Sequence, residues 1–443
     1  MGEGDSKKTI MECSLSYIVT NEVGSVVAEG SAKAQLDASF LSIFPDLGDP
    51  WLFSYSDIVG ISEGDYRINL FLSSKGSVTL TELGYQYEDF LINLYRLRGE
   101  LLLRYLLMDE KLREPGVEAI FIYFDDQGEE TYRGSCELRL YDTALVVLPQ
   151  KGEPVRVPYS YVTAFKGEDY SFELETEFGE RFVLSQMGEK FDFFVRSFSK
   201  AMNEIFGRVQ SLIREILPQL DPVKARKLSH LIREGRAAKK EELDLISEEF
   251  WTQMEKRVKT IDLSEGYEFL KGLSQEKKIC IGIKRGLMGD LTGDYIWLLI
   301  PVYDADPAKP GNAIALEAVS GEDEGRATYF FRLTNRKEYP QFGDLVNLHG
   351  EYDLFVKTIN RCMIDINFRR EPIYLSDERL DDPKFAMYRY AVRRLPSLRT
   401  LRNLFIGRVI HSSPEQWRED VTDLLKFNVS TVDDSRKWRK GAE

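Results

Sequence analysis

The amino-acid sequence predicts an α+β protein in which one β-rich domain occurs twice. When the chain is shifted by 104 positions, 17 of the 82 residues from Cys13 to Leu94 match their counterparts without a gap. Unrelated segments share far fewer identities, so a duplicated unit is the simplest explanation. The repeating unit is of domain size, roughly 100 residues, which is too long for a solenoid repeat.

Each copy is expected to contain about seven short strands followed by one amphipathic helix. Short apolar runs separated by Asn, Asp, Gly and Pro predict the strands, with Asp65-Tyr66 and Asp169-Tyr170 expected to begin two of them. Apolar residues at helical spacing then predict one helix per copy. They are Tyr87, Phe90, Leu91, Leu94 and Leu97 in the first copy, and Phe191, Phe194, Val195, Phe198 and Met202 in the second.

Two equivalent phrases suggest a known fold. Phe53-Ser-Tyr-Ser-Asp-Ile58 and Val157-Pro-Tyr-Ser-Tyr-Val162 resemble a strand entry of bacterial pleckstrin-homology-like (PH-like) and GRAM-like domains. The resemblance implies tandem PH-like units at residues 10–108 and 115–206, each a bent antiparallel sheet capped by a C-terminal helix. The phrase carries no catalytic residue.

The rest of the chain predicts three further segments. Residues 207–270 are charged and amphipathic, and predict a helical connector with a solvated face. Residues 275–370 predict strands and then a helix from Gly350, and we interpret them as a diverged third PH-like unit. Residues 371–443 predict an Arg-rich helical tail.

Composition narrows the class of protein. The net charge of −14 disfavours a nucleic-acid binder, because such proteins need a cationic surface. The single cysteines Cys13, Cys136, Cys280 and Cys362 predict neither a disulfide framework nor a zinc site. With no apolar run long enough to span a bilayer, we expect a cytoplasmic protein without a transmembrane segment.

The sequence predicts no catalytic, cofactor-binding or metal-binding residue, and therefore no enzyme. The histidines, His230, His349 and His411, are far apart in the sequence and are expected to be structural. The glycine-rich stretch 282–293 lacks the Gly-Lys-Ser/Thr ending of a phosphate loop and lies between two apparent strands, so a hairpin loop is expected there.

Anion binding is the sharpest functional possibility. PH domains bind phosphoinositides with Lys and Arg in the first hairpin loop, but here those loops are Asn21-Glu-Val-Gly24 and Asp125-Asp-Gln-Gly128. The cations that could bind an anionic partner lie later in the chain. They are Lys284, Arg285, Arg389, Arg393, Arg394, Arg399, Arg402 and Arg408.

The functional expectation is protein interaction or scaffolding on tandem PH-like domains, with an unidentified protein partner. The first alternative is peripheral binding to an anionic membrane through Lys284, Arg285 and the tail. In the opposing interpretation, the tail arginines pack against the acidic remainder of their own chain. An enzyme with an unrecognised site is the second alternative.

Overall fold

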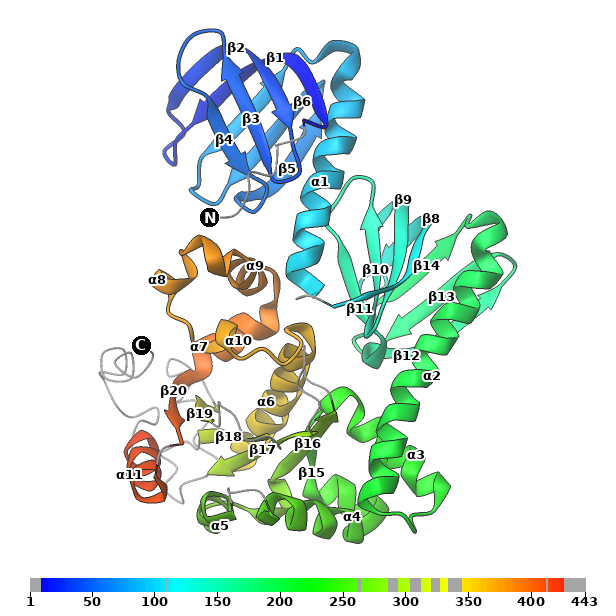
Figure 1. Ribbon diagram of the computed structural model, residues 1–443, viewed down its shortest axis with the longest axis vertical. Helices are drawn as coiled ribbons and strands as arrows, with labels where there is room; N and C mark the ends of the chain where they lie inside the picture. Colours follow the sequence, from blue (N-terminus) through cyan, green and yellow to red (C-terminus); the bar gives the residue numbers. More distant parts are fainter. Residues whose placement is uncertain are drawn as a thin grey trace, which may run out of the picture. The chain divides into compact units, whose positions relative to one another are not determined.

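The computed structural model describes residues 9–107, 110–260, 264–285, 294–302, 312–319, 327–333, 345–411 and 413–425 (Figure 1). The chain divides into two compact units. The first comprises Met1–Val157 and Tyr161–Ser197, and the second comprises Pro158–Ser160 and Phe198–Glu443.

The first unit contains two seven-stranded antiparallel sheets with the same strand order. The order is β4-β3-β2-β1-β7-β6-β5 in the first sheet and β11-β10-β9-β8-β14-β13-β12 in the second. The strands of the first are β1 (Met11–Thr20), β2 (Val26–Leu36), β3 (Phe40–Pro45), β4 (Trp51–Ser54), β5 (Ile58–Gly64), β6 (Arg67–Leu72) and β7 (Ser77–Thr81). Those of the second are β8 (Leu112–Phe124), β9 (Glu130–Tyr141), β10 (Ala144–Pro149), β11 (Val155–Pro158), β12 (Val162–Glu168), β13 (Ser171–Thr176) and β14 (Arg181–Ser185).

Each sheet curls into a half-barrel around its own core, which agrees with the predicted α+β class. Along β13 the buried residues Phe172 and Leu174 alternate with exposed Glu173 and Glu175, the pattern of a strand with one buried face. We call the β1–β7 sheet with its core the first copy, and the β8–β14 sheet with its core the second copy.

Asp65-Tyr66 and its counterpart Asp169-Tyr170 form turns, so the prediction that they begin strands is wrong. All four residues have φ between 50° and 58°, and Gly64 pairs directly with Arg67 across the turn. A two-residue hairpin turn of this kind needs positive φ at both central positions, because only then does its twist match that of the strands.

Helix α1 (Tyr87–Leu107) belongs to both copies. Its first half buries Phe90, Leu91 and Leu94 in the core of the first copy. Its second half buries Leu103 and Leu107 against residues of the second copy, namely Tyr141, Val146 and Leu148. A helix of 21 residues is about 30 Å long, so it extends past the sheet that it caps and reaches the next one (Figure 1).

Ion pairs reinforce this shared helix. Arg98 of α1, which is 3% exposed, donates to the Ile58 carbonyl of the first copy and to Glu153 of the second at 2.7 Å. Glu100 of α1 accepts two hydrogen bonds from Arg139 on β9. Apolar and charged contacts of α1 therefore join the two copies, and Lys151 of the second copy adds a direct ion pair with Glu63 of β5 at 3.5 Å.

Helix α2 (Phe191–Ile216) begins in the first unit, where Phe194 packs edge-on against Phe172. The second unit contains α3 (Pro222–Leu231), β15 (Ala238–Lys239), α4 (Lys240–Thr260), α5 (Ser264–Gly272), β16 (Cys280–Arg285), β17 (Asp294–Val302), β18 (Asn312–Val319) and β19 (Ala327–Arg332). It continues with α6 (Leu345–Asp365), α7 (Glu371–Tyr374), α8 (Asp377–Leu380), α9 (Ala386–Arg394), α10 (Pro396–Leu404), β20 (Phe405–Ile410) and α11 (Pro414–Leu425).

The sheet of the second unit does not repeat the N-terminal fold. Its six strands lie in the sequential order β15-β16-β17-β18-β19-β20, so the interpretation of residues 275–370 as a third copy is wrong. β15 comes from the predicted connector, and β20 comes from the predicted helical tail. Helix α6 begins at Leu345, five residues before the expected Gly350. The strands predicted within residues 275–370 are confirmed as β16 to β19, and β16 pairs antiparallel with β17. The first four residues of the predicted loop 282–293 belong to β16, and residues 286–293 and 426–443 lie outside the described ones.

Helices cover both faces of this sheet. On one face, Leu298 and Leu316 share a core with Ile213 of α2 and Trp251 of α4. On the other face, Phe331 packs against Phe355 of α6 at 5.3 Å between ring centroids. The predicted connector is thus one layer of the unit, because its apolar stripe is buried by the sheet. Among the described residues, no helix is both long and apolar enough to cross a membrane.

We predict that Arg98→Met destabilises the protein by about 2 kcal/mol, because it leaves the Ile58 carbonyl without its buried donor. Urea unfolding monitored by circular dichroism measures the change. Arg104→Met is the matched control, because Arg104 lies on the same helix and is exposed. Equal stability of the two variants would show that Arg98 does not hold the two copies together.

Candidate interaction surface

The predicted anion-binding cations lie on separate elements of the second unit. Lys284 and Arg285 are on β16. The others are on α9 (Arg389, Arg393, Arg394), α10 (Arg399, Arg402) and β20 (Arg408). The side chain of Arg285 lies outside the described set, and of the others Arg394 and Arg399 are exposed.

Two of the tail arginines are bound within their own chain. Arg402 donates to the carbonyls of Pro372 and Leu375 at 2.7 and 2.8 Å and to the Asp377 carboxylate at 2.6 Å. The Arg408 guanidinium lies 3.9 Å from the centre of the Tyr374 ring. Both side chains hold the segment around α7 against its neighbours, which agrees with the interpretation that tail arginines pack on the chain itself.

Lys284 and Arg399 also contact their own chain. The Lys284 ammonium lies 4.5 Å from the centre of the Phe368 ring, and Arg399 donates to the carbonyls of Val392 and Arg393. Gly282, the first glycine of the glycine-rich stretch 282–293, is required by packing, because a Cβ at this position would overlap Trp297 and the Gly235 carbonyl.

The first hairpin loops carry no cation that could hold a phosphate. In the first copy, Asn21 Oδ1 accepts from the backbone amides of Val23 and Ser25. In the second copy, Asp125 Oδ1 accepts from Gln127 and Glu129 in the same way. The equivalent acceptors close equivalent turns, so their role is structural.

The histidines and cysteines are widely separated and packed. The His230 ring lies 5.1 Å from that of Phe206, and burial lowers its pKa. His411 bonds to the Thr328 hydroxyl at 2.8 Å. All four cysteines are buried, and burial raises the pKa of Cys136 to about 12, which disfavours the reactive thiolate. Within the described ranges, no group of three His, Cys, Asp or Glu residues could hold a metal ion.

A buried ionic cluster lies on the α6-facing side of the second unit's sheet. Glu317 of β18 is 2% exposed, accepts from the Tyr295 hydroxyl at 2.6 Å and lies 3.1 Å from Arg370 Nε. Burial raises the pKa of Glu317, while Arg370 and the Tyr295 hydroxyl oppose this rise. Since Arg370 neutralises an otherwise isolated carboxylate, the cluster is best explained as a packing element.

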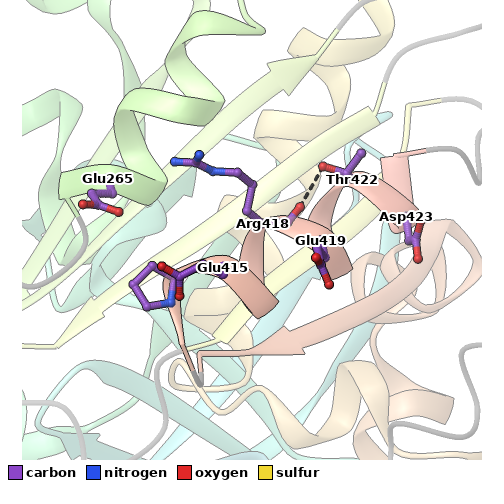
Figure 2. A pocket seen from close by; sticks show the side chains of 7 residues that line it. Glu265, Glu415, Arg418, Glu419, Thr422 and Asp423 are labelled. Atoms are coloured by element: carbon purple, nitrogen blue, oxygen red, sulfur yellow. Dashed lines mark hydrogen bonds between the residues drawn. The ribbon is translucent and has the colours of Figure 1, made fainter.

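A hollow of about 590 Å³ lies between α5 and α11 (Figure 2). Glu265 of α5 lines one side, and Glu415, Arg418, Glu419 and Asp423 of α11 line the other. The Arg418 side chain extends from α11 towards α5, where its guanidinium lies 5.3 Å from the centre of the Phe269 ring. The carboxylates spread around the hollow without a common centre, so they define no ligand geometry (Figure 2).

The first unit exposes an apolar surface that the sequence analysis missed. On the outer side of β3 and β4, Phe44 is 38% exposed and Leu52 is 56% exposed, and Leu47 in the connecting loop is 92% exposed. Ser42 pairs with Leu52 across the two strands and therefore lies on the same side, although it is itself buried at 6% exposure. We call this surface of Ser42, Phe44, Leu47 and Leu52 the β3–β4 face.

The equivalent surface of the second copy is covered. At the offset of 104, Phe44 corresponds to Leu148, which is 8% exposed, while Ser42 and its counterpart Val146 are both buried, at 6% and 0%. The second half of α1 buries Val146 and Leu148. Comparing outward-facing positions between the two copies would have shown Leu47 where the second copy has Lys151, and Leu52 where it has Arg156.

Comparison with known proteins gives structural neighbours only. No protein-family model matches the chain, and no curated protein matches it. The C-terminal domain of an unknown protein from Leishmania infantum is 11% identical, with a TM-score of 0.19, and the match covers 23% of this chain and 96% of that one. The Spt16D–Pob3N heterodimer is 12% identical over 38% of this chain and 85% of that one, with a TM-score of 0.17. Neither likeness bears on function.

We predict that Arg370→Met costs about 3 kcal/mol of stability, because it leaves Glu317 as an uncompensated buried charge. Without Arg370 the pKa of Glu317 rises further. A carboxyl group whose pKa is raised in the folded protein contributes stability at low pH, and this stability is lost as the pH rises through the raised pKa. The destabilisation by Arg370→Met should therefore be larger at about pH 8 than at about pH 5.

Urea unfolding at both pH values measures this difference. Lys384→Met is the control, because Lys384 is exposed and its ion pair with Asp382 lies at the surface. The second variant Arg370→Met/Glu317→Leu removes both charges and should recover most of the loss at the higher pH. A loss for Arg370→Met that is the same at both pH values would show that Glu317 does not depend on Arg370.

Proposed function

We propose that the chain is a non-enzymatic protein-interaction platform built on two tandem PH-like units, and that the β3–β4 face is its binding surface. The observation that supports this proposal is the difference between the copies. Leu148 is buried by α1 in the second copy, whereas its counterpart Phe44 and the neighbouring Leu47 and Leu52 are exposed in the first.

An exposed apolar face on a folded sheet favours a protein partner. Phe44, Leu47 and Leu52 lie together on neighbouring strands and their connecting loop, where their exposure to water is unfavourable. Burial of such side chains contributes about 25 cal/mol per Å² of apolar area to association. Large apolar side chains at the centre of an interface commonly carry most of its binding energy.

The shared helix also suits a platform. Because α1 contacts both copies through Arg98 and through leucines in each half, the first unit presents its surfaces on one connected scaffold. A preorganised surface loses less conformational entropy when a partner binds.

An anionic membrane remains the competing function, but the cations that it would need are partly committed elsewhere. Arg402 and Arg408 hold the α7 segment, and the first hairpin loops are acidic or neutral. Protein binding therefore explains the exposed β3–β4 face, whereas membrane binding would need cations that already contact their own chain.

We predict that Phe44→Asp/Leu52→Asp removes the protein's specific partners. Affinity capture from native lysate of the source cells, followed by quantitative mass spectrometry, compares this variant with the wild type. Leu245→Asp is the control, because Leu245 is an equally apolar residue of α4 that is 88% exposed. A partner set that is unchanged in the β3–β4 variant but altered in Leu245→Asp would contradict the proposed surface.

A further inference from the structure

We infer that the β3–β4 face takes one amphipathic helix of a partner protein, bound as α1 binds the second copy. This inference rests on the proposed function and names the partner's chemistry. The duplication supplies the template, because α1 covers Leu148 in the second copy while the equivalent Phe44 is exposed in the first.

The occupied surface shows which helix residues make the contact. Leu103 and Leu107 of α1 pack on Val146 and Leu148. Gly99 lies one turn before Leu103, and a Cβ placed on it would be in van der Waals contact with Leu148 at 3.5 Å, so the helix backbone lies close to the sheet there. Gly99, Leu103 and Leu107 are each four residues apart and therefore form one stripe along the helix.

Charged groups set the direction of α1 on the second copy. Arg98 donates to Glu153 in the loop between β10 and β11 at 2.7 Å. Glu100 accepts from Arg139 of β9, which pairs with Val146 across the sheet. Arg98 and Glu100 of α1 thus fix how the helix is oriented on the strands of the second copy.

The open surface keeps one apolar position and the acidic end of this pattern, because Ser42 and Asp37 stand where α1 covers Val146 and Tyr141. Phe44 stands where Leu148 stands, and exposed Asp49 stands where Glu153 accepts from Arg98. The position of Arg139 is occupied by Gln35, which already donates to Glu12. A helix that fits this surface therefore has a cation followed directly by a small residue. Leucines stand four and eight positions after the small residue. Such a helix does not need an acid in the place of Glu100.

The first copy has room for a larger apolar contact than the second. Leu52 replaces Arg156, whose guanidinium pairs with Glu110 just after α1. Leu47 replaces Lys151, which pairs with Glu88 at 2.7 Å. Both replacements exchange a paired charge for an exposed apolar side chain, so the bound helix should be more apolar along its edge than α1 is.

The test uses a peptide of residues 96–110 of this chain, labelled with fluorescein and carrying terminal lysines for solubility. The full-length protein is titrated into the peptide, and fluorescence anisotropy reports binding. We expect saturable binding, weakened at least about tenfold by Phe44→Asp or by Leu52→Asp, a change of about 1.4 kcal/mol that lies within the range of a central hot-spot contact. Leu245→Asp should bind like the wild type, and a peptide with Leu103→Asp and Leu107→Asp should not bind.

The milder variant Phe44→Ser guards against misfolding, because serine already occupies the neighbouring outward position 42. Circular dichroism verifies that each variant is folded. Absent binding, or binding unaffected by Phe44→Ser and Leu52→Asp, would overturn the inference. So would a wild-type dimer in sedimentation velocity that Phe44→Asp converts to monomer, since a second copy would then cover the face.

The outcomes separate this inference from the proposed function. If the capture experiment loses partners in the β3–β4 variant while the peptide does not bind, the platform stands and the helical partner is wrong. If the peptide binds but no captured partner depends on the face, the helix site stands and the proposed function fails.

Discussion

The first unit depends on one constraint: α1 is longer than the sheet that it caps. Its first half completes the core of the first copy, and the residues that follow must bury a second apolar stripe elsewhere. Leu103 and Leu107 do so on the outer side of β10, where Arg98 and Glu100 add charged contacts to the second copy. Two domains with equivalent folds thereby acquire different surfaces.

This asymmetry explains how a duplicated domain can hold one structural surface and one open surface. In the second copy β10 is buried on both sides, so Val146 and Leu148 are apolar for reasons of stability. In the first copy the described residues contain no helix before the sheet, and Phe44 and Leu52 are exposed. Apolar side chains left in this position impose an aggregation risk unless a partner covers them.

The sequence predicted the mixed class, the paired sheets at an offset of 104 and the strands of the second unit, because local patterns specify local elements. It failed where tertiary packing decides. Asp65-Tyr66 and Asp169-Tyr170 stand at the start of alternating apolar runs, but all four residues take positive φ in turns. Phe405–Ile410 followed a helical pattern of arginines and leucines, yet it pairs with β19 as the last strand of the sheet. The arginines could not be assigned from sequence, since carbonyl acceptors such as that of Leu375 are invisible there. The β3–β4 face was missed because an exposed Leu looks like a core Leu until its neighbours are known.

Hydroxyl-radical footprinting of the full-length protein tests most directly whether α1 covers one copy and leaves the other open. Side-chain oxidation, read by mass spectrometry, compares Leu52 and Phe44 with Leu148 after correction for intrinsic reactivity. The account predicts strong labelling of Leu52 and Phe44 and near-complete protection of Leu148, in line with their exposures of 56%, 38% and 8%. Equal labelling of the equivalent residues Phe44 and Leu148 would contradict it.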